Sequence, residues 1–158
     1  MESKHILPLE IQTMPKEFGI EFGRLDHNPV RSVATISTHD MPTMRGWWLE
    51  DKERANRFWH RALAHGGAAP EGDMPEHLAQ EVVERHLQCP SMLCLLSLQD
   101  WLAIDSRLRL PDAAAERINI PSNPRHYWRY RMHLTIEQLT REKDFCQQLQ
   151  ELISWADR

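Results

Sequence analysis

Cysteine is scarce in this 158-residue sequence, and its three positions, Cys89, Cys94 and Cys146, have no regular spacing. An odd number at irregular spacing excludes a fully paired disulfide framework, which small secreted domains use in place of a large core. We therefore expect reduced thiols that pack as small hydrophobic side chains in a protein of the cytoplasm.

The sequence also has no long hydrophobic run. Its longest apolar stretch covers residues 91–98, whereas a membrane-spanning helix needs about 20 apolar residues. The first residues, "MESKHILPLEI", lack the basic start and the long apolar segment of a signal peptide. We therefore expect neither a signal peptide nor a membrane partner.

Positive charge is not in excess either. The formal net charge is -4 and the pI is near 6.1, whereas proteins that bind nucleic acid by neutralising phosphates are usually basic. The segment "RHYWRYR" alternates basic and aromatic residues in a manner typical of single-strand binding, but the acidic balance of the chain outweighs it. We expect no nucleic-acid partner.

Histidines at metal-ligand spacing are missing as well. His60 and His65 are five residues apart, and His77 and His86 are nine apart. A helical two-histidine zinc site instead places its ligands at positions i and i+4. We interpret all four as solvated side chains on helix surfaces, and we expect no metal and no cofactor.

The hydrophobic residues that are present predict two buried strands and a domain-sized core. They make up 41% of the chain. Residues 32–37 and 91–98 are apolar almost throughout, which is typical of strands in a parallel sheet covered by helices on both faces. A short strand or edge segment is predicted over residues 6–12, and the Gly- and Pro-containing residues 14–31 are interpreted as a loop.

Helical patterns follow the strands. The expected helices are one after Pro42 that is periodic from Leu49 to Gly66–Gly67, one from a cap at Asp73 to Pro90, one within residues 101–110, and a C-terminal one from a Thr135 capping box to about Trp155. Residues 117–133 are an expected surface loop. This order predicts an α/β fold with a parallel pair of strands. A complete (β/α)8 barrel needs eight strands and at least ~200 residues, so we expect part of such a domain.

Polar side chains follow both predicted strands. His39 and Asp40 end the first strand, and Gln99 and Asp100 end the second. In parallel α/β folds, ligands bind at the carboxyl ends of the strands, so these residues are candidates for a binding face. The alternative for Asp40 is a helix N-cap before Pro42. The alternative for Asp100 is a cap of the following helix, which we favour there.

Six tryptophans are many for this length. Trp59 and Trp155 fall on apolar stripes of predicted helices and are expected in the core. Trp47, Trp48 and Trp128 are close to predicted strand-end loops, where a flat aromatic ring can cover the apolar face of a sugar. Core packing is an equally good interpretation of each of the three, and we retain Trp48 as the binding candidate.

Four segments together resemble the C-terminal part of the 4-α-glucanotransferases, the family of amylomaltases and disproportionating enzymes. They are "LPLEIQTMPK", "STHDMPTMRGWW", "SLQDWLAID" and "RINIPSNPRHYWRYRM", in the family's order. The first is similar to the branch of larger cytosolic transglucosidases. The resemblance implies that residues 1–158 are the C-terminal portion of a (β/α)8 barrel, with residues 32–37 as its seventh strand and 91–98 as its eighth.

The resemblance also implies a reaction, which is the retaining transfer of α-1,4-glucan segments between maltooligosaccharides or larger glucans. Asp40, from "THD", inherits the role of a third carboxylate that favours the transition state. His39 is implied to hydrogen-bond the sugar, and Asn119, from "RINIP", to reach the substrate. Ile118 replaces the family's Met, and Met41–Pro42 stands where many members have Asn-Asp, which leaves the acceptor sugar open.

In the family, the nucleophile and the acid/base both precede the segment that resembles "LPLEIQTMPK". The resemblance therefore implies that the isolated chain lacks both groups and is inactive. The open edges of an incomplete barrel predict self-association. The alternative is a non-catalytic module that binds glucan or a partner protein through Trp47, Trp48 and Trp128.

Overall fold

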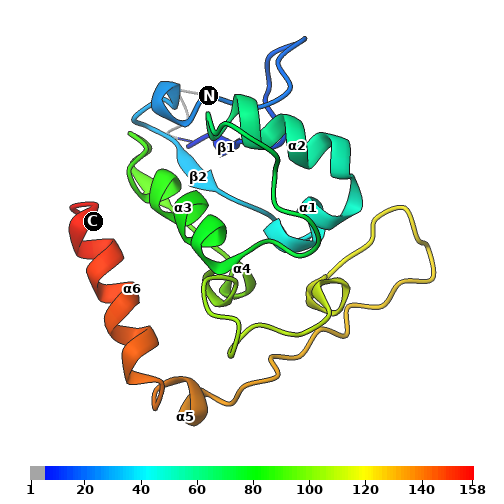
Figure 1. Cartoon of the computed structure of the whole chain (residues 1–158), viewed down its shortest axis with the longest axis vertical. Helices are drawn as coiled ribbons and strands as arrows, with labels where there is room; N and C mark the ends of the chain where they lie inside the picture. Colours follow the sequence, from blue (N-terminus) through cyan, green and yellow to red (C-terminus); the bar gives the residue numbers. More distant parts are fainter. Residues whose placement is uncertain (1–5) are drawn as a thin grey trace.

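The protein is built around a three-stranded sheet with helices grouped beside it (Figure 1). The computed structural model describes residues 6–158. The strands are β1 (Leu9–Ile11), β2 (Val33–Thr35) and β3 (Leu93–Cys94). The helices are α1 (Met44–Glu50), α2 (Lys52–Arg61), α3 (Glu76–Leu87), α4 (Leu98–Leu102), α5 (Ile136–Leu139) and α6 (Lys143–Trp155). Two short 3-10 helices are η2 (Leu25–His27) and η3 (Ala113–Glu116).

The sheet is parallel, and its strands lie side by side in sequence order. Leu9 of β1 pairs with Val33 of β2, which pairs with Leu93 of β3. This confirms the predicted α/β class, the parallel pair and the short N-terminal strand. β3 is much shorter than the predicted 91–98, because the chain leaves the sheet after Cys94 and Ser97 caps α4. An apolar run alone does not separate a buried strand from a buried helix start.

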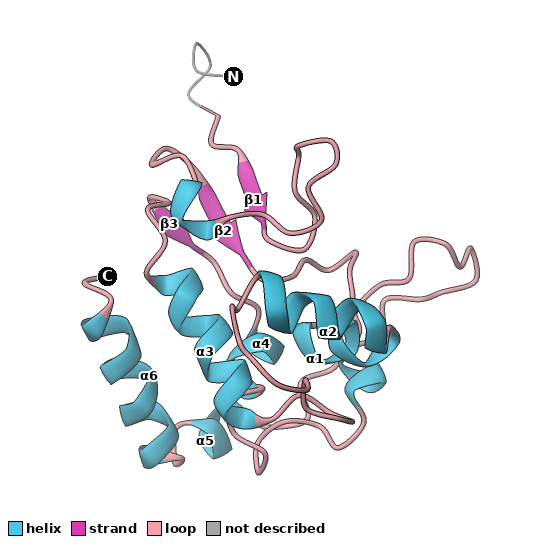
Figure 2. Ribbon diagram, turned by 45° about the horizontal axis from the view of Figure 1, so that its top comes forward, coloured by secondary structure: helices cyan, strands magenta, loops and turns pink. Residues whose placement is uncertain are grey.

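The helices are grouped on one side of the sheet (Figure 2), and the outer strands are partly exposed on the other face. Neighbouring side chains of a strand point to opposite faces. Ile36 and Cys94 lie on the covered face and pack in or against the main core. Leu9, Leu93 and Leu95 lie on the other face, where they are 43%, 43% and 60% exposed. The predicted burial of both faces is therefore wrong at β3.

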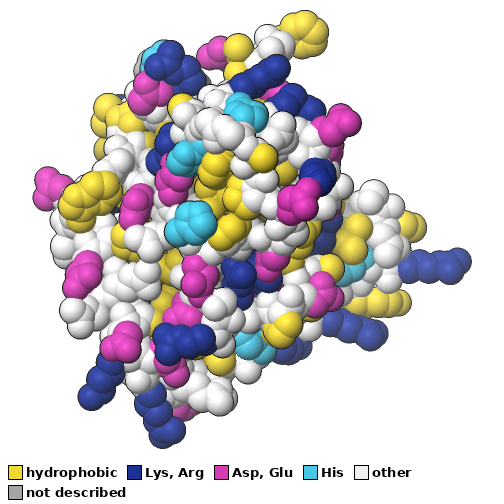
Figure 3. Space-filling model, viewed as in Figure 1, with side chains coloured by type: hydrophobic (Ala, Val, Ile, Leu, Met, Phe, Trp, Pro, Cys, Tyr) yellow, Lys and Arg dark blue, Asp and Glu magenta, His cyan; other side chains and the backbone are white. Residues whose placement is uncertain are grey.

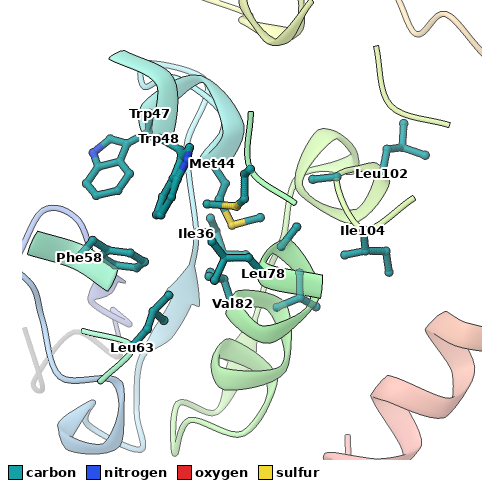
Figure 4. Packing of buried hydrophobic residues seen from close by; sticks show 14 of the residues in the cluster. Ile36, Met44, Trp47, Trp48, Phe58, Leu63, Leu78, Val82, Leu102 and Ile104 are labelled. Atoms are coloured by element: carbon teal, nitrogen blue, oxygen red, sulfur yellow. The ribbon is translucent and has the colours of Figure 1, made fainter. Parts of the chain in front are cut away.

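The main core lies between the sheet and helices α1 to α4. Trp47 and Trp48 of α1 are directed into it beside Phe58 of α2 (Figure 4). The rings of Trp47 and Phe58 are 5.2 Å apart in an edge-to-face arrangement, which adds about 0.5–1.5 kcal/mol beyond the burial itself. Leu78 and Val82 of α3 fill the opposite side of this core. Removal of this apolar surface from water is the main force that holds the helices on the sheet.

The helices after β2 begin and end at other residues than predicted. Thr43 caps α1, so the predicted alternative of Asp40 as the N-cap is wrong. The segment then divides into two helices, because Asp51 leaves the helical conformation and caps α2. Helix α2 ends at Arg61, before the Gly66–Gly67 pair that was expected to end it.

Asp73 does not cap α3, which instead follows Pro75 directly. Its carboxylate binds the guanidinium of Arg45 with an N–O distance of 2.5 Å. Arg45 is buried in α1, and it also binds Glu116 at 2.5 Å and donates to the carbonyl oxygen of Leu110 at 2.8 Å. Burial lowers the pKa of Arg45, but the two carboxylates outweigh burial and raise it above its ordinary value. A buried charge needs such partners because its desolvation is costly.

The C-terminal helix begins at the predicted cap and ends at the predicted residue, but it is divided into α5 and α6 by a break at residues 140–142. Thr135 and Gln138 make a reciprocal capping box, with the Gln138 backbone N–H donating to the Thr135 hydroxyl at 3.1 Å. Helix α6 ends at Trp155 and lies against α3, with Phe145 and Leu152 buried in the main core (Figure 1). Trp155 itself is 62% exposed, so its predicted place in the core is wrong.

The cysteines agree with the expectation of reduced thiols that are at least partly buried. Cys89, Cys94 and Cys146 are free thiols, and burial raises the pKa of Cys94 to about 11, which suppresses its reactivity. Within residues 6–158, no helix is both long and apolar enough to cross a bilayer. The signal-peptide prediction concerns residues 1–11, of which residues 1–5 lie outside the described chain.

The histidines have mixed environments. His60 and His77 are exposed, as predicted. His65 is half-buried and stacks on Trp59 with ring centroids 4.1 Å apart, and Trp59 in turn packs against the main core. His86 is only 1% exposed, so its predicted place on a solvated surface is wrong. The described residues contain no group of side chains that would hold a metal ion.

His86 is a neutral histidine locked inside the core. Its Nδ1 lies 2.7 Å from the carbonyl oxygen of Val82, and because a carbonyl only accepts, Nδ1 carries the proton. The other ring nitrogen, Nε2, is buried and has no partner among the described residues. Burial lowers the pKa of His86 from 6.5 to about 4.

We predict that His86 makes the protein less stable in mild acid. Below pH 6.5 the unfolded chain takes up a proton that the folded chain resists until about pH 4, so stability falls as the pH falls through this window. The expected loss between pH 7 and pH 5 is about 2 kcal/mol. Urea unfolding at the two pH values measures it, and His86→Gln should remove it.

The matched control is His77→Gln, which alters an exposed histidine on the same helix. This variant should keep the pH dependence of the unaltered chain. An identical pH dependence in both variants would show that burial of His86 does not control acid stability.

Candidate functional site at the end of strand β2

The chain between β2 and α1 carries the predicted pair His39 and Asp40 to the surface. A turn follows the strand, in which the backbone N–H of Met41 donates to the carbonyl oxygen of Thr38 at 3.1 Å. The side chains of His39 and Asp40 are 54% and 53% exposed. Since β2 ends at Thr35, both residues lie beyond the carboxyl end of a parallel strand. Ligands bind at this position in such folds.

Both ends of this segment are held by one buried carboxylate. Asp100 accepts a hydrogen bond from the hydroxyl of Ser37 at 2.6 Å and from the backbone N–H of Met44 at 3.1 Å. It also accepts from the hydroxyl of Ser97 at 2.8 Å. Burial raises the pKa of Asp100, although the three hydrogen bonds oppose that shift. Residues 38–43 are thus a short loop closed at its base.

Asp40 is joined to a residue far away in the sequence. The side-chain amide of Asn119 donates to Asp40 Oδ1 at 2.7 Å, and the two residues are 79 positions apart. The Nε2 atom of His39 lies 3.4 Å from Asp40 Oδ2. The structure therefore brings together three of the four predicted site residues.

Trp128 extends this cluster with an aromatic surface. Its ring lies 5.1 Å from the ring of His39, centroid to centroid, with an angle of 46° between the planes. Trp128 is 59% exposed, and the neighbouring Tyr127 is exposed as well. Of the three tryptophans expected near strand-end loops, Trp128 is the one placed beside the predicted polar residues. We refer to His39, Asp40, Asn119 and Trp128 as the β2-end cluster.

The loop of residues 117–133 carries Asn119 and Trp128 across the surface (Figure 1). Arg117 anchors it, because its Nε donates to the carbonyl oxygen of Asn119 at 2.9 Å and its Nη1 binds Glu50 at 3.0 Å. Basic side chains project from this part of the molecule, while acidic and basic groups are mixed over the rest of the face in view (Figure 3). The role of Arg117 was not predicted, although it stands two residues before Asn119 in "RINIP".

The fourth predicted site residue, Trp48, lies elsewhere. It is 3% exposed in the core formed by α1 and α2, so the packing alternative is correct and a direct contact with a sugar is excluded in this structure (Figure 4). Gln99 and Asp100 also fail to reach the surface, because both belong to α4 and are buried. Their predicted place at the end of a strand is wrong, and so is the favoured alternative of Asp100 as the cap of the following helix, because Ser97 caps α4.

The β2-end cluster has the chemistry of a site for a hydroxyl-rich ligand. The carboxylate of Asp40 accepts hydrogen bonds, the amide of Asn119 both donates and accepts, and the imidazole of His39 does either according to its tautomer. The exposed ring of Trp128 supplies an apolar face. Hydrogen bonds and ion pairs among the described residues bring one carboxylate, that of Asp40, into this cluster.

A larger hollow of about 650 Å³ lies elsewhere, between residues 19–26 and the ends of α2 and α3. Its arginines already have partners, because Arg61 binds Glu21 and Arg85 binds Glu81.

Comparison with known proteins gives consistent matches. The 4-alpha-glucanotransferase family model matches residues 1–136. The 4-alpha-glucanotransferase DPE2 of Oryza sativa subsp. japonica is 36% identical over all 158 residues, which span 17% of that protein. The 4-alpha-glucanotransferase of Chlamydia muridarum is 30% identical over 72% of this chain and 21% of its own length.

A solved structure shares the fold. The amylomaltase of Streptococcus agalactiae, determined in complex with acarbose, superimposes on 99% of this chain and 28% of its own, with a TM-score of 0.68 and 16% identity. The chain thus spans between 17% and 28% of the length of these relatives. Because the family model covers most of its length, the chain belongs to the 4-alpha-glucanotransferase family.

Proposed function

We propose that the β2-end cluster is one corner of an active site that transfers α-1,4-glucan segments between maltooligosaccharides or larger glucans. The observation that carries this proposal is the 2.7 Å hydrogen bond between Asn119 and Asp40. Family resemblance gives each of these residues a part in substrate binding, and the fold brings them together from opposite ends of the chain. Asp40 is 53% exposed, so a ligand can reach its carboxylate from solvent.

In this proposal the three strands belong to a (β/α)8 barrel, with β2 as the seventh strand and β3 as the eighth. The parallel order β1-β2-β3 supports this assignment, because consecutive strands of such a barrel are neighbours. The open face that carries Leu9, Leu93 and Leu95 would point to the barrel interior, which is filled by branched apolar side chains. The cluster would lie at the catalytic face.

The proposed roles follow from the chemistry of retaining transfer. The transition state resembles an oxocarbenium ion, and hydrogen bonds to sugar hydroxyls strengthen as it forms. Asp40 would accept those hydrogen bonds, and Asn119 would hold its carboxylate in place and contribute a further donor. His39 would bond the sugar at the cleavage point, and Trp128, in place of the predicted Trp48, would pack on a sugar face.

A cytoplasmic location belongs to the same proposal. The three free cysteines support it, because thiols stay reduced in that compartment. The proposed partners are maltooligosaccharides or α-glucan.

We predict that the 158-residue chain binds maltoheptaose and that Asp40→Asn weakens binding. The substitution keeps the shape of the side chain but removes its negative charge. Hydrogen bonds from sugar hydroxyls are stronger to a charged carboxylate than to a neutral amide. The expected loss of affinity is about tenfold or more. Isothermal titration calorimetry measures it.

The matched control is Asp144→Asn, an exposed aspartate on α6. This variant should bind maltoheptaose with unchanged affinity. Absence of binding at millimolar sugar, or equal affinities for the two variants, would contradict the proposed site.

A second prediction concerns catalysis. Retaining transfer needs a nucleophile and an acid/base about 5–5.5 Å apart, and the cluster of described residues contains Asp40 alone. We therefore expect the 158-residue chain to release no glucose from maltotriose. Release that persists after a contaminating enzyme has been excluded would overturn this expectation.

The exposed aromatic surface favours a second candidate function, a non-catalytic module that binds glucan or a partner protein. Trp128 and Tyr127 are 59% and 67% exposed next to each other. Such a module would bind through stacking, so Trp128→Ala would abolish binding while Asp40→Asn would leave it intact. The calorimetric experiment thus separates the two functions.

We also propose that the chain self-associates through its open sheet face, because exposed apolar surface on a sheet drives association. Light scattering over a wide range of protein concentrations should detect a dimer or larger species. Leu95→Glu places a charge on this face and should shift the population towards monomer, whereas Leu49→Glu, on exposed helix surface, should not. A monomer at all concentrations would contradict the proposal.

A further inference from the structure

The Asp40 and Asn119 segments are joined at two levels. At the surface, Asn119 donates to Asp40 at 2.7 Å. Below the surface, the hydroxyl of Thr43 donates to the carboxylate of Glu116 at 3.1 Å. Thr43 follows Asp40 by three residues, and Glu116 precedes Asn119 by three. The outer link is exposed and the inner link is buried.

We propose that Glu116 is a positioning residue, which anchors the start of the 117–133 loop on α1 and thereby aims the amide of Asn119 at Asp40. Glu116 thus supports the β2-end cluster from inside without touching the ligand. Its importance for sugar binding rests on the proposed function, whereas its contacts with Thr43 and Arg45 do not.

Glu116 is suited to this role because it is held from three sides. Its carboxylate binds Arg45 at 2.5 Å and accepts from Thr43, and its carbonyl oxygen accepts from Gln99 Nε2 at 3.3 Å. Its side chain is 3% exposed and that of Arg45 is 1% exposed. Removing one partner of a buried ion pair leaves an uncompensated charge, so this arrangement has little freedom to adjust.

Arg117 carries the restraint from the anchor to Asn119. One end of its guanidinium binds Glu50 at the C-terminal end of α1, and its Nε holds the carbonyl oxygen of Asn119. The backbone is therefore fixed at residues 116 and 119. His126 adds a contact from the far side of the loop, with Nε2 at 2.9 Å from the carbonyl oxygen of Ile118.

The structure provides a matched control within the same ion cluster. Arg45 binds a second carboxylate, that of Asp73, which lies in the connection before α3 and has no hydrogen bond to the 117–133 loop in the described chain. Glu116→Gln and Asp73→Asn each neutralise one of the two carboxylates on Arg45 without changing side-chain size. If Glu116 had a purely structural role, each variant would loosen the Asn119 amide only in proportion to the stability that it loses.

The test is water-exchange NMR of the Asn119 side-chain amide, recorded without sugar and assigned with Asn119→Ala. In Glu116→Gln the amide should exchange about tenfold faster, which corresponds to a loss of about 1.4 kcal/mol, the order of one hydrogen bond to a carboxylate. In Asp73→Asn it should stay as in the unaltered chain. Urea unfolding of the same variants shows how far each one loses stability.

Arg117→Lys provides a second variant that alters only the surface part of the anchor. It keeps the charge beside Glu50 but loses the planar Nε donor to Asn119, so amide exchange should again increase. This variant decides the matter if Glu116→Gln fails to fold. The proposal is overturned if a folded Glu116→Gln leaves the amide exchange unchanged, if Glu116→Gln and Asp73→Asn change it equally, or, where Glu116→Gln does not fold, if Arg117→Lys leaves it unchanged.

Sugar titration is a separate measurement on the same variants. If the amide responds as predicted but maltoheptaose binds to none of the proteins, the positioning role stands and the proposed function fails. If the unaltered chain binds and Glu116→Gln binds about tenfold more weakly, both hold.

Discussion

The buried carboxylate of Asp100 is the interaction on which the site depends. It receives hydrogen bonds from Ser37, at the base of the loop that carries His39 and Asp40, and from Met44, at the other base of that loop. It therefore determines how the chain leaves the sheet and enters α1. Buried carboxylates are costly unless fully bonded, and the same cost makes this junction specific, because alternative arrangements leave it unsatisfied. The positions of the exposed residues His39 and Asp40 thus depend on Asp100, which is fully buried.

A second buried cluster extends the same principle to the distant part of the chain. Arg45 lies on α1, which Asp100 fixes at its first turn, and Arg45 in turn holds Glu116. Asn119 is thus positioned relative to Asp40 through a continuous series of contacts: sheet, Asp100, α1, Arg45 and Glu116. In this series the buried groups of Asp100, Arg45 and Glu116 have several partners each, whereas Asp40 faces solvent. That division is what a binding surface on a rigid support requires.

Much of the architecture was predictable because local signals agreed with the fold. The Thr135 capping box formed as expected because a cap is a local pattern, and the parallel pairing followed from the order of strands and helices along the chain. Family resemblance implied that Asp40 and Asn119 both act on the substrate, but their pairing was not predicted, because no local pattern connects residues 79 positions apart. The errors arose where tertiary contacts decide the outcome. The run at 91–98 was apolar enough for a strand, yet Ser97 caps a helix. Trp48 and His86 are buried because the faces of α1 and α3 that carry them pack into the core.

The open sheet has a consequence for the symmetry of any assembly. β1 and β3 are the outer strands of a parallel sheet, and they are different in sequence. Pairing of β3 with β1 of the next copy would be head-to-tail, so it generates either a closed ring or an unlimited filament. Contact between two open faces is instead self-complementary and stops at a two-fold dimer. The order of the strands therefore determines that a finite pair and a growing polymer arise from different surfaces of the same small sheet.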